Sequence, residues 1–523
     1  MNRRELLQSG VAAAAMLSAG SRARTAPSGA EFSIDAALAD FMKAIGGSPD
    51  DAGGRIVFTG RDPILRSPFR LGACMAIPAM AGGVGAAAIW RERTGEPQDL
   101  SADLRQAIYG IAPWAELLAA FNIAAGALPA DWLPKEWTWR PTLNGRDYQA
   151  PFILGNPLGF QVFQAKDGRL VTPTGIYPHH FNGFLALIGA GPDPKQIADR
   201  IRTFDSSDLE EQVGEAGMII GIHRTAEEWA AHPQGKAIAD TPVIEIIKVG
   251  DSDPVPWPSA PVSPLSGVRV LANSHVIAST AAARTLAGFG AEVLHVARDQ
   301  GFEHEALVTD VNVGMRSTML NLKDPEQSRV QQRLVPRADV FVEGFRGRKM
   351  EELGFGVEEV ARMKPGIVYV SIRPYGWEGP WKMFAGFDME ALTVTGFTLI
   401  QGGGQRPSFP PTFVMNDYVA GYMGAAGVLA ALRRRAKEGG SYHVRVHLAR
   451  CAMWFMSLGQ IPEAESEQRG PENVLIAPEV IRGQTPYGEL ERLAPLVKLS
   501  RTPTRWREPL VAVRGGDTPT WSH

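Results

Sequence analysis

The chain has 523 residues, of which 45% are hydrophobic and 21% are charged, a balance typical of folded globular proteins. This length exceeds what one hydrophobic core serves and predicts two or three domains. The net charge of −3 argues against a nucleic-acid-binding protein, which usually carries a basic patch. With only two cysteines, Cys74 and Cys451, neither a disulfide framework nor a CxxC metal site is possible.

The N-terminus has the pattern of an export signal. Arg3 and Arg4 precede the apolar stretch Gly10–Gly20, and small residues follow, as in a twin-arginine signal. A disordered extension or a mis-chosen start codon is the alternative, and residues 1–30 are left out of the fold in either case. The stretch is too short to cross a bilayer. We expect no later stretch with the roughly 18 uncharged apolar residues of a membrane span.

Two segments, residues 71–111 and 415–455, share one layout: an Ala/Gly-rich helix, a turn and an alternating strand. At an offset of 344 residues, identical residues coincide: Gly83 with Gly427, Ala86 with Ala430, Arg91 with Arg435, Gly95 with Gly439 and Leu104 with Leu448. We expect an internal repeat of one supersecondary unit, and therefore two related lobes. Residues 31–150 would form the first, degenerate lobe.

Residues 151–262 are predicted to form a small α+β domain. Residues 160–178 have the pattern of a hairpin with its turn at Lys166–Gly168. Four helical segments are expected after it: Phe181–Ile188, Pro194–Thr203, Asp208–Ala216 and Thr225–Ala231. The proline-rich run 251–267 is a linker to the next domain.

Residues 263–460 alternate between strand and helix patterns. An Ala-rich helical stretch, Val276–Phe289, lies between two apolar runs, which is the length of one parallel strand–helix–strand unit. The predicted strands are Val268–Leu271, Val293–Val296, Asp339–Glu343 and Ile367–Ile372. This alternation predicts an α/β fold with a doubly wound, Rossmann-like parallel sheet, in which ligands bind at the carboxyl ends of the strands.

The strand ends expected to bind a ligand are residues 272–279, 297–299, 344–346 and 373–376. A nicotinamide cofactor is not expected there. The dinucleotide fingerprint needs its glycines in the turn before the first helix, whereas Gly288 and Gly290 follow that helix as a cap and turn.

Asp417 is the main catalytic candidate. We expect it immediately before the helix Tyr418–Arg435, where it caps free N–H groups and stays ionised at the positive end of the helix dipole. A plain helix cap is the alternative role. In the first copy of the repeat, Ala73 takes its place. The glycines of this helix indicate close approach of a backbone or a ligand.

Two histidine pairs, His179–His180 and His443/His447, raise the question of a metal site. No carboxylate or cysteine stands at ligand spacing beside either pair, so no metal is predicted.

Several segments occur in the order found in one family: PLSGVRVL and LAGFGAEVLHV, RSTMLNLKDPE (316–326), ADVFVEGFRGRKMEELGFG (338–356), PGIVYVSIRPYGWEGPW (365–381), GFDMEALTVTG (386–396) and the Asp417 repeat. From residue 264 to about 455 the chain resembles the class III coenzyme A transferases, which include formyl-CoA transferase, carnitine-type CoA-transferases and α-methylacyl-CoA racemase. Residues 495–503 resemble the family's C-terminal segment. Residues 60–262 resemble its later half, which implies two rearranged halves, with a C-terminal extension (461–523) packed on the lobes.

The resemblance implies an acyl-CoA:carboxylate CoA-transferase. Asp417 falls where the family keeps its nucleophilic aspartate, and Asp388 matches a second acidic position that supports the site. Asp417 would attack an acyl-CoA thioester to give a mixed anhydride, and then an aspartyl-CoA thioester. CoA is implied as a substrate, not a permanent cofactor, with a carboxylic acid as acceptor. The residues implied to contact CoA are Ala278, Arg298, Leu320, Lys323 and Phe345, with Arg316 as an addition.

Some positions depart from the family. Phe387 stands where the racemases keep a catalytic histidine, Glu352 replaces a basic residue near adenine, and Ala297 replaces an acid. A racemase or isomerase of acyl-CoA thioesters, and a non-catalytic CoA-binding protein, stay open as alternatives. The resemblance implies a homodimer without nucleic-acid or membrane partners. It also implies the cytoplasm, where CoA thioesters occur, against the export-like N-terminus.

Overall fold

The computed structural model describes residues 32–109, 141–147, 156–159, 161–298, 303–404, 406–412, 414–466 and 470–522. The predicted export signal, residues 1–30, lies outside these residues, as does much of the second half of the predicted first lobe.

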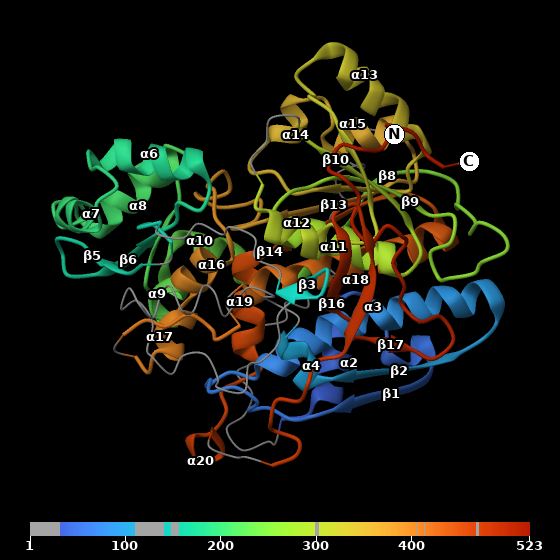
Figure 1. Ribbon diagram of the computed structural model, residues 1–523, viewed down its shortest axis with the longest axis horizontal. Helices are drawn as coiled ribbons and strands as arrows, with labels where there is room; N and C mark the ends of the chain where they lie inside the picture. The colour runs from blue at the N-terminus through green and yellow to red at the C-terminus, as the bar shows by residue number, and fades with distance from the viewer. Residues whose placement is uncertain are drawn as a thin grey trace, which may run out of the picture.

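A seven-stranded sheet in the order β11-β10-β9-β12-β13-β14-β8 forms the centre of the molecule (Figure 1). Its parallel strands are β9 (Arg269–Asn273), β10 (Glu292–Ala297), β11 (Arg316–Met319), β12 (Val340–Glu343), β13 (Val368–Arg373) and β14 (Ser441–His447). The chain runs outward from β9 to β11 and then returns to β12 on the other side of β9. This reversal is the switch point of a doubly wound sheet, so the predicted α/β fold is confirmed.

The strand β8 (Ile244–Gly250) closes one edge of this sheet, antiparallel to β14. The predicted boundaries placed this segment in the small domain, and the structure differs. Ile244 is 2% exposed and packs against the helix that covers β14, so the strand belongs to the core of the large sheet. A short apolar run carries no local signal of the sheet that it joins.

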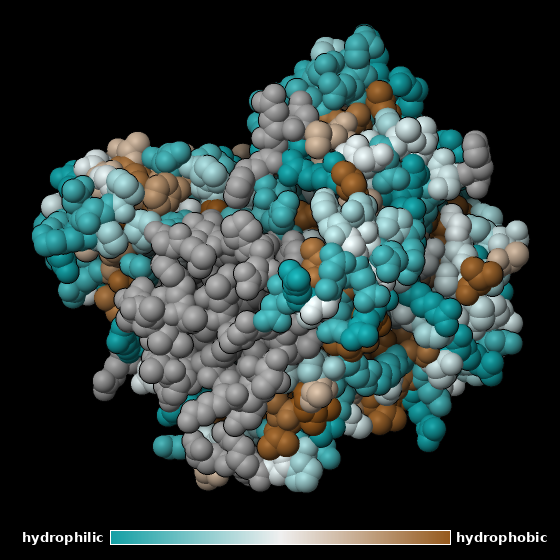
Figure 2. All heavy atoms as spheres, viewed as in Figure 1, coloured by the Kyte–Doolittle hydropathy of each residue, from teal (hydrophilic) through white to brown (hydrophobic). Residues whose placement is uncertain are grey.

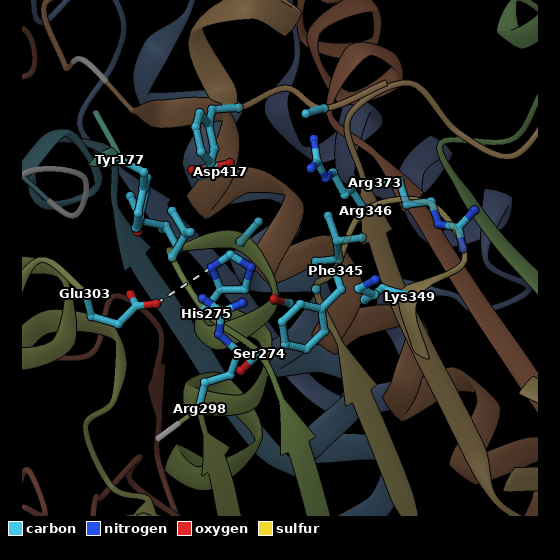
Figure 3. Close-up of a pocket in the computed structure, with 18 of the residues that line it drawn as sticks. Tyr177, Ser274, His275, Arg298, Glu303, Phe345, Arg346, Lys349, Arg373 and Asp417 are labelled. Atoms are coloured by element: carbon cyan, nitrogen blue, oxygen red, sulfur yellow. Dashed lines mark ion pairs between the residues drawn. The ribbon is translucent and has the colours of Figure 1, made fainter. Parts of the chain in front are cut away.

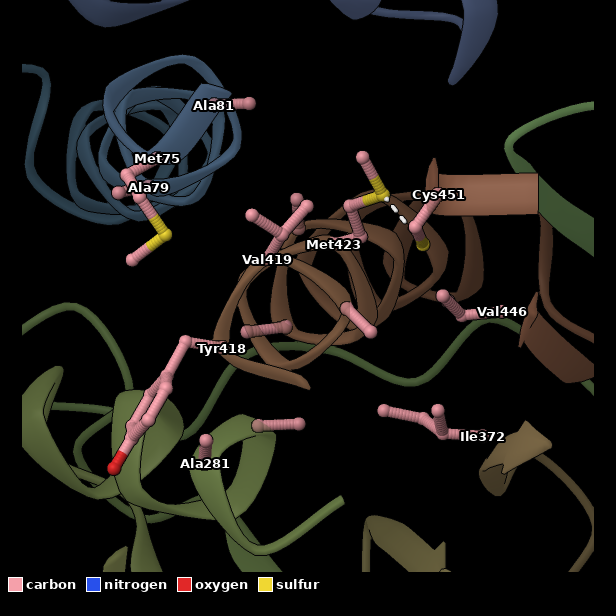
Figure 4. Close-up of a cluster of buried hydrophobic side chains, with 14 of the residues drawn as sticks. Met75, Ala79, Ala81, Ala281, Ile372, Tyr418, Val419, Met423, Val446 and Cys451 are labelled. Carbon is pink, nitrogen blue, oxygen red and sulfur yellow. Dashed lines mark hydrogen bonds between the residues drawn. The ribbon is translucent and has the colours of Figure 1, made fainter. Parts of the chain in front are cut away.

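Helices cover both faces of the sheet. One face carries α11 (Ala278–Gly288) and α18 (Met415–Glu438), and α3 (Leu71–Thr94) packs on α18 from outside (Figure 4). The other carries α13 (Pro325–Leu334) and α15 (Val357–Met363). The remaining helices of the region 303–466 are α12 (Glu305–Val311), α14 (Lys349–Glu352), α16 (Asp388–Thr395), α17 (Phe397–Gln401), α19 (Leu448–Ser457) and α20 (Glu463–Ser466), with the 3-10 helix η2 (Val335–Arg337).

The first lobe is a smaller unit of the same kind. It contains α2 (Ile34–Ala44), η1 (Pro49–Ala52), β1 (Gly53–Thr59), α3, β2 (Gln98–Asp103) and α4 (Leu104–Tyr109). The helices α3 and α18 have 24 residues each and begin 344 residues apart. The strand after each helix has a parallel neighbour on one side and an antiparallel one on the other. These neighbours are β1 and β17 (Lys498–Leu499) for β2, and β13 and β8 for β14.

Gly83 and Gly427, which coincide in the predicted repeat, make equivalent contacts. A Cβ atom at Gly83 would lie 2.8 Å from Leu100 and Val497, and one at Gly427 would lie 2.5 Å from Val444 and 2.8 Å from Ile244. Leu100 and Val444 are themselves separated by 344 residues. In both lobes the absent side chain therefore lets the helix lie directly on the strand.

The helix α3 is long and apolar enough to span a membrane, and the part that meets this test is 100% buried within the protein. The expectation that no stretch after the N-terminus reaches this length and apolarity is therefore wrong. The helix packs against α2, α4 and α18 instead. A helix that is apolar on every side can be the central helix of a large core as well as a membrane span.

The small domain lies at one end of the molecule (Figure 1). The predicted hairpin forms, with β5 (Phe163–Gln164) paired to β6 (Leu170–Pro173), and β7 (Ile220–Ile222) completes the sheet. Its helices are α6 (Pro178–Ile188), α7 (Pro194–Ile201), α8 (Ser206–Glu215), α9 (Ala226–Ala231) and α10 (Pro233–Ile238).

The C-terminal segment crosses the molecule rather than forming a unit of its own. Its hairpin, β15 (Val480–Thr485) and β16 (Gly488–Leu493), pairs with β3 (Thr142–Leu143), which pairs with β4 (Arg146–Asp147). Its last residues reach the large sheet, where Trp521 donates a hydrogen bond to Leu334 O. Outside the grey atoms, hydrophobic side chains on the face in Figure 2 form small separate groups, as is usual for protein surfaces.

The glycine contacts predict opposite effects of the same substitution at adjacent positions. Gly83→Ala and Gly427→Ala should each lower the free energy of unfolding by about 1–3 kcal/mol, because the new methyl group overlaps a strand side chain. At Gly82 the nearest atom would be 3.9 Å away, so Gly82→Ala should leave stability unchanged or raise it by up to about 1 kcal/mol. Urea unfolding of the three variants measures the difference, and equal effects at 82 and 83 would contradict it.

Candidate active site

A cavity of about 620 Å³ opens at the carboxyl ends of β9, β10, β12 and β13 (Figure 3). All four strand ends that the sequence analysis singled out contribute to its lining, through residues 274–279, 297–298, 344–346 and 373–374. Tyr177, His179 and His180 of the small domain also line it, as do Asp417 and, from the C-terminal segment, Arg514. The described part of the chain thus brings four distant segments to one cavity.

The two loops at the switch point are tightly packed. In the loop after β9, Val276 has a φ of 62°, a left-handed conformation that is unfavourable for a β-branched residue. In the loop after β12, a Cβ atom at Gly344 would lie 2.0 Å from the Ser279 hydroxyl oxygen. The rings of His275 and Phe345 approach within 5.0 Å across the cavity wall. Strained backbone of this kind concentrates at functional sites.

Asp417 lies in the first turn of α18, not before it. The helix begins at Met415 after the N-cap Val414, so the expectation that Asp417 caps the helix is wrong. Its own N–H instead donates a hydrogen bond of 2.8 Å to Asp388 Oδ2. The side chain is free to face the cavity, and the residue is 4% exposed.

The expectation that Asp417 stays ionised is also wrong. Burial raises the pKa of Asp417 to about 7, and the nearby charge of Glu390 adds to the shift. Burial and the charge of Asp417 raise the pKa of Asp388 well above its usual value. The helix dipole stabilises the ionised form by less than the loss of water around a full negative charge destabilises it. The net effect on the pKa is therefore upward. Asp417 therefore exchanges its proton near neutral pH.

Asp388 lies beside the first turn of α18, where its carboxylate accepts a hydrogen bond from the backbone N–H of Asp417. The first lobe has the same arrangement, because Asp62 accepts hydrogen bonds from Gly72 N–H (3.0 Å) and Ala73 N–H (2.9 Å) at the start of α3. Ala73 is the residue that coincides with Asp417. A carboxylate in this place is thus retained where the nucleophile candidate is missing, which makes Asp388 a positioning residue.

The predicted CoA contacts divide into two groups. Ala278, Arg298 and Phe345 line the cavity together with Asp417. Leu320 and Lys323 do not, since Leu320 is packed into the hydrophobic cluster on the opposite face of the sheet and Lys323 is exposed to solvent. Asp388 also lies outside the lining, beneath Asp417.

Arg316 is engaged elsewhere. Its guanidinium group is 12% exposed and forms ion pairs with Glu292 (3.2 Å) and Asp517 (3.4 Å), and it donates to the carbonyl oxygens of Thr518 and Thr520. These contacts tie the C-terminal segment to the edge of the sheet. The proposed CoA site therefore does not include Arg316, Leu320 or Lys323.

Sequence analysis missed most cations of the cavity. Besides Arg298, the lining contains Arg346, Arg348, Lys349, Arg373 and Arg514. Four of these follow β12 or β13, so their position at strand ends was the available signal. Arg514 lies more than 200 residues from Arg298, and no local pattern could have placed the two side by side. Together they form a positive surface suited to phosphate groups.

The small domain contributes the other wall. The ring of Tyr177 stacks on Phe387 at 5.8 Å, and His180 meets Phe387 edge-on at 5.7 Å. Burial and the nearby charges of His179 and Arg346 lower the pKa of His180 to about 3, so its ring is neutral near pH 7.

The two histidine pairs lie in different parts of the protein. His443 bonds to Ser371 through Nε2 at 2.8 Å, and His447 bonds to Glu245 at 3.0 Å, both inside the sheet. The rings of His179 and His180 lie 3.9 Å apart at the cavity, with their planes tilted by 48°. Among the described residues, no group of three His, Cys, Asp or Glu side chains could hold a metal ion.

Residues 265–478 match the family model described as CoA-transferase family III. We refer to this part of the chain, which is similar to that family, as the family III region. A protein named acetyl-coenzyme A transferase from Hypoxylon pulicicidum is 30% identical over 61% of this chain and 58% of the relative. Succinyl-CoA:glutarate CoA-transferase of Mus musculus is 31% identical over 34% of this chain and 44% of the relative. The chain therefore spans about half the length of these curated relatives.

A solved structure of a CaiB/BaiF family protein from Brucella suis is 25% identical, with a TM-score of 0.34, over 37% of this chain and 55% of that one. The family III region contains the parallel strands β9 to β14 of the large sheet, the strand-end loops, Asp388 and Asp417. Tyr177, His180 and Arg514 lie outside it.

The raised pKa of Asp417 predicts a stabilising substitution. Asp417→Asn should increase the free energy of unfolding at pH 8 by about 2–4 kcal/mol, because the wild-type chain must then ionise a buried carboxyl with a pKa of about 7. The unfolded chain ionises near its ordinary pKa, so the difference should shrink as the pH falls from 7 toward 4. Urea unfolding at pH 8 and pH 5 tests this, and a variant less stable than wild type at pH 8 would refute it.

Asp388 and Asp62 make equivalent contacts, so their removal should cost similar amounts of stability. Asp388→Ala and Asp62→Ala should each lower the free energy of unfolding by about 1–3 kcal/mol, because each leaves backbone N–H groups without an acceptor at the start of a buried helix. Asp388→Asn and Asp62→Asn keep an accepting oxygen and should lose less than the alanine variants. Chemical unfolding at pH 7 compares the pairs, and equal loss in the Ala and Asn variants would contradict the capping role.

Proposed function

We propose that the protein is an acyl-CoA:carboxylate CoA-transferase in which Asp417 is the nucleophile. One observation carries the proposal: a buried acid that exchanges its proton near pH 7 faces a cavity whose walls bear several cations. The family III region that contains this acid is similar to proteins named CoA-transferases.

The first half of the reaction forms a mixed anhydride. An oxygen of the Asp417 carboxylate attacks the carbonyl carbon of the acyl-CoA thioester, the C–S bond breaks, and CoA leaves as a thiolate. Burial removes water from around Asp417, which makes its carboxylate a better nucleophile and protects the anhydride from hydrolysis. The hydrogen bond from Asp417 N–H to Asp388 fixes the backbone from which this attack occurs.

The second half passes CoA to the acceptor. The thiolate attacks the aspartyl carbon of the anhydride, which gives an aspartyl-CoA thioester and releases the donor as a free carboxylate. The acceptor carboxylate then attacks the aspartyl carbon of this thioester, which breaks the C–S bond and gives a second mixed anhydride and free CoA thiolate. The thiolate attacks the acceptor carbonyl carbon of that anhydride, which forms the acceptor's thioester and releases the Asp417 carboxylate. Holding both partners in one cavity makes each step effectively unimolecular.

CoA binding would use the cationic wall. Arg298, Arg346, Arg373 and Lys349 can pair with the phosphate groups, which are the only permanent charges of CoA. Ala278 and Phe345 add apolar surface to the same lining.

The racemase alternative needs a second base beside Asp417. Phe387 cannot serve, and His180, the imidazole nearest to it among the ring contacts of the described residues, has its pKa lowered to about 3. Such a ring is a weak base at neutral pH. Solvent deuterium at the α-carbon of recovered acyl-CoA would favour racemisation all the same.

A homodimer and a cytoplasmic location are further proposals. They follow from the use of CoA thioesters and the resemblance to the family. A monomer with full activity in sedimentation and assay would remove the dimer from the proposal.

The decisive experiment is the mass of the intact protein after mixing with a panel of acyl-CoAs, with hydroxylamine trapping and peptide mapping. We expect an acyl or CoA adduct at Asp417 that is absent in Asp417→Asn. Below pH 7 the rate of adduct formation should rise about tenfold per pH unit, because only the ionised carboxylate attacks. Tight CoA binding without an adduct in the wild-type chain would reject the transferase and favour a binding protein.

A further inference from the structure

Glu303 is a second acid of the cavity, and the proposed reaction leaves it without a role. Its side chain is 18% exposed, and one carboxyl oxygen lies 3.7 Å from His275 Nδ1 (Figure 3). The Tyr177 hydroxyl and Val276 N–H both lie close to this carboxyl group and lower its pKa. The strained turn at Val276 thus has a local consequence, since it directs a backbone N–H toward this carboxyl group.

Tyr177 links Glu303 to the nucleophile. It is 4% exposed, and its ring is held between Phe387 at 5.8 Å and His304 at 5.1 Å. Burial raises the pKa of its hydroxyl well above the usual value, and the charges of Glu303 and Asp417 add to the shift. In Figure 3, Tyr177 lies on the side of Glu303 that faces Asp417. Its ring is fixed by packing, and its proton is kept at neutral pH.

We propose that the Tyr177 hydroxyl is a catalytic hydrogen-bond donor to the acyl oxygen of the substrate, and that Glu303 is the residue that positions it. This inference rests on the proposed transferase function. When Asp417 attacks, the thioester carbonyl oxygen gains negative charge, and a fixed donor beside it stabilises that charge. The hydroxyl keeps its proton throughout, so the bonds made and broken are those of the acyl transfer itself.

The state of Glu303 decides where the Tyr177 proton points. A protonated Glu303 donates to the phenol oxygen and leaves the phenol hydrogen for the substrate. An ionised Glu303 accepts that hydrogen and withdraws it. The active form therefore combines a protonated Glu303 with an ionised Asp417.

The charges around Glu303 set the pH range. Burial raises the pKa of Glu303 to about 7. It outweighs the lowering by the charges of Arg514 and Arg298 and by the nearby Val276 N–H and Tyr177 hydroxyl. His275 is the remaining titratable neighbour, and burial and Arg298 lower its pKa to about 4, so its ring is neutral throughout this range. Adduct formation should therefore rise with pH as Asp417 ionises, and fall above about pH 7 as Glu303 loses its proton.

The test measures the rate of adduct formation at Asp417 from pH 5.5 to 8.5. Tyr177→Phe keeps the ring contacts and removes the donor, so we expect the rate to fall about 10²-fold, with CoA affinity by calorimetry changed less than about threefold. Tyr442→Phe is the matched control, because Tyr442 is also a buried tyrosine whose hydroxyl bonds to a glutamate, Glu438, but it does not line the cavity. It should leave the rate unchanged.

Glu303→Gln separates positioning from simple support of the fold. Its amide can still donate to the Tyr177 oxygen and cannot ionise, so the fall in rate above pH 7 should disappear while the rise below it stays. Glu303→Ala should lower the rate at every pH, and the glutamine variant should restore it. Equal rates in wild type and Tyr177→Phe, or a descending limb that persists in Glu303→Gln, would overturn the inference and leave the transferase intact. A wild-type chain without any adduct would overturn both.

Discussion

The close seating of α18 is the constraint on which the rest of the molecule depends. The helix lies between α11, the large sheet and α3, and its glycines leave no space at the points of contact (Figure 4). A Cβ atom at Gly421 would meet the backbone oxygen of Ala278 at 2.9 Å, and one at Gly427 would meet Val444 at 2.5 Å. The helix can therefore occupy one position, and Asp417 in its first turn is fixed with it.

In this position, three carboxyl groups are almost completely buried. Asp417, Asp388 and Glu390 are each at most 4% exposed, and their burial raises the pKa of all three. The hydrogen bonds of Asp388 to the helix backbone and of Glu390 to Phe387 N–H offset part of that unfavourable burial. Asp62 repeats the capping contact in the first lobe without a reactive neighbour. The fold thus explains the cap, and the proposed nucleophilic role would account for the burial of Asp417.

The cavity joins two kinds of surface from different parts of the chain. The strand ends of the family III region supply cations on one wall, and the small domain supplies aromatic rings on the other. In water, solvent screens the electrostatic effect of a hydroxyl group on a reacting atom. In a largely buried site the dielectric is low, so each fixed dipole acts more strongly on the reacting atoms. The small domain is therefore as relevant to the chemistry as the Rossmann-like lobe, although the family model does not extend to it.

The sequence by itself determined the α/β lobe, the strand ends that line the cavity and Asp417 as a member of it. Period-two apolar runs, Ala-rich helices and their turns are local signals, and they located β9, α11, β10, β12 and β13 to within one or two residues. Tertiary structure alone decided the protonation of Asp417, the capping role of Asp388, the placement of β8 in the large sheet and the withdrawal of Arg316 into ion pairs with Asp517. It also brought Tyr177, Glu303 and Arg514 to one cavity. Burial and proximity between residues far apart in the chain set these properties, and no local pattern of residues encodes either.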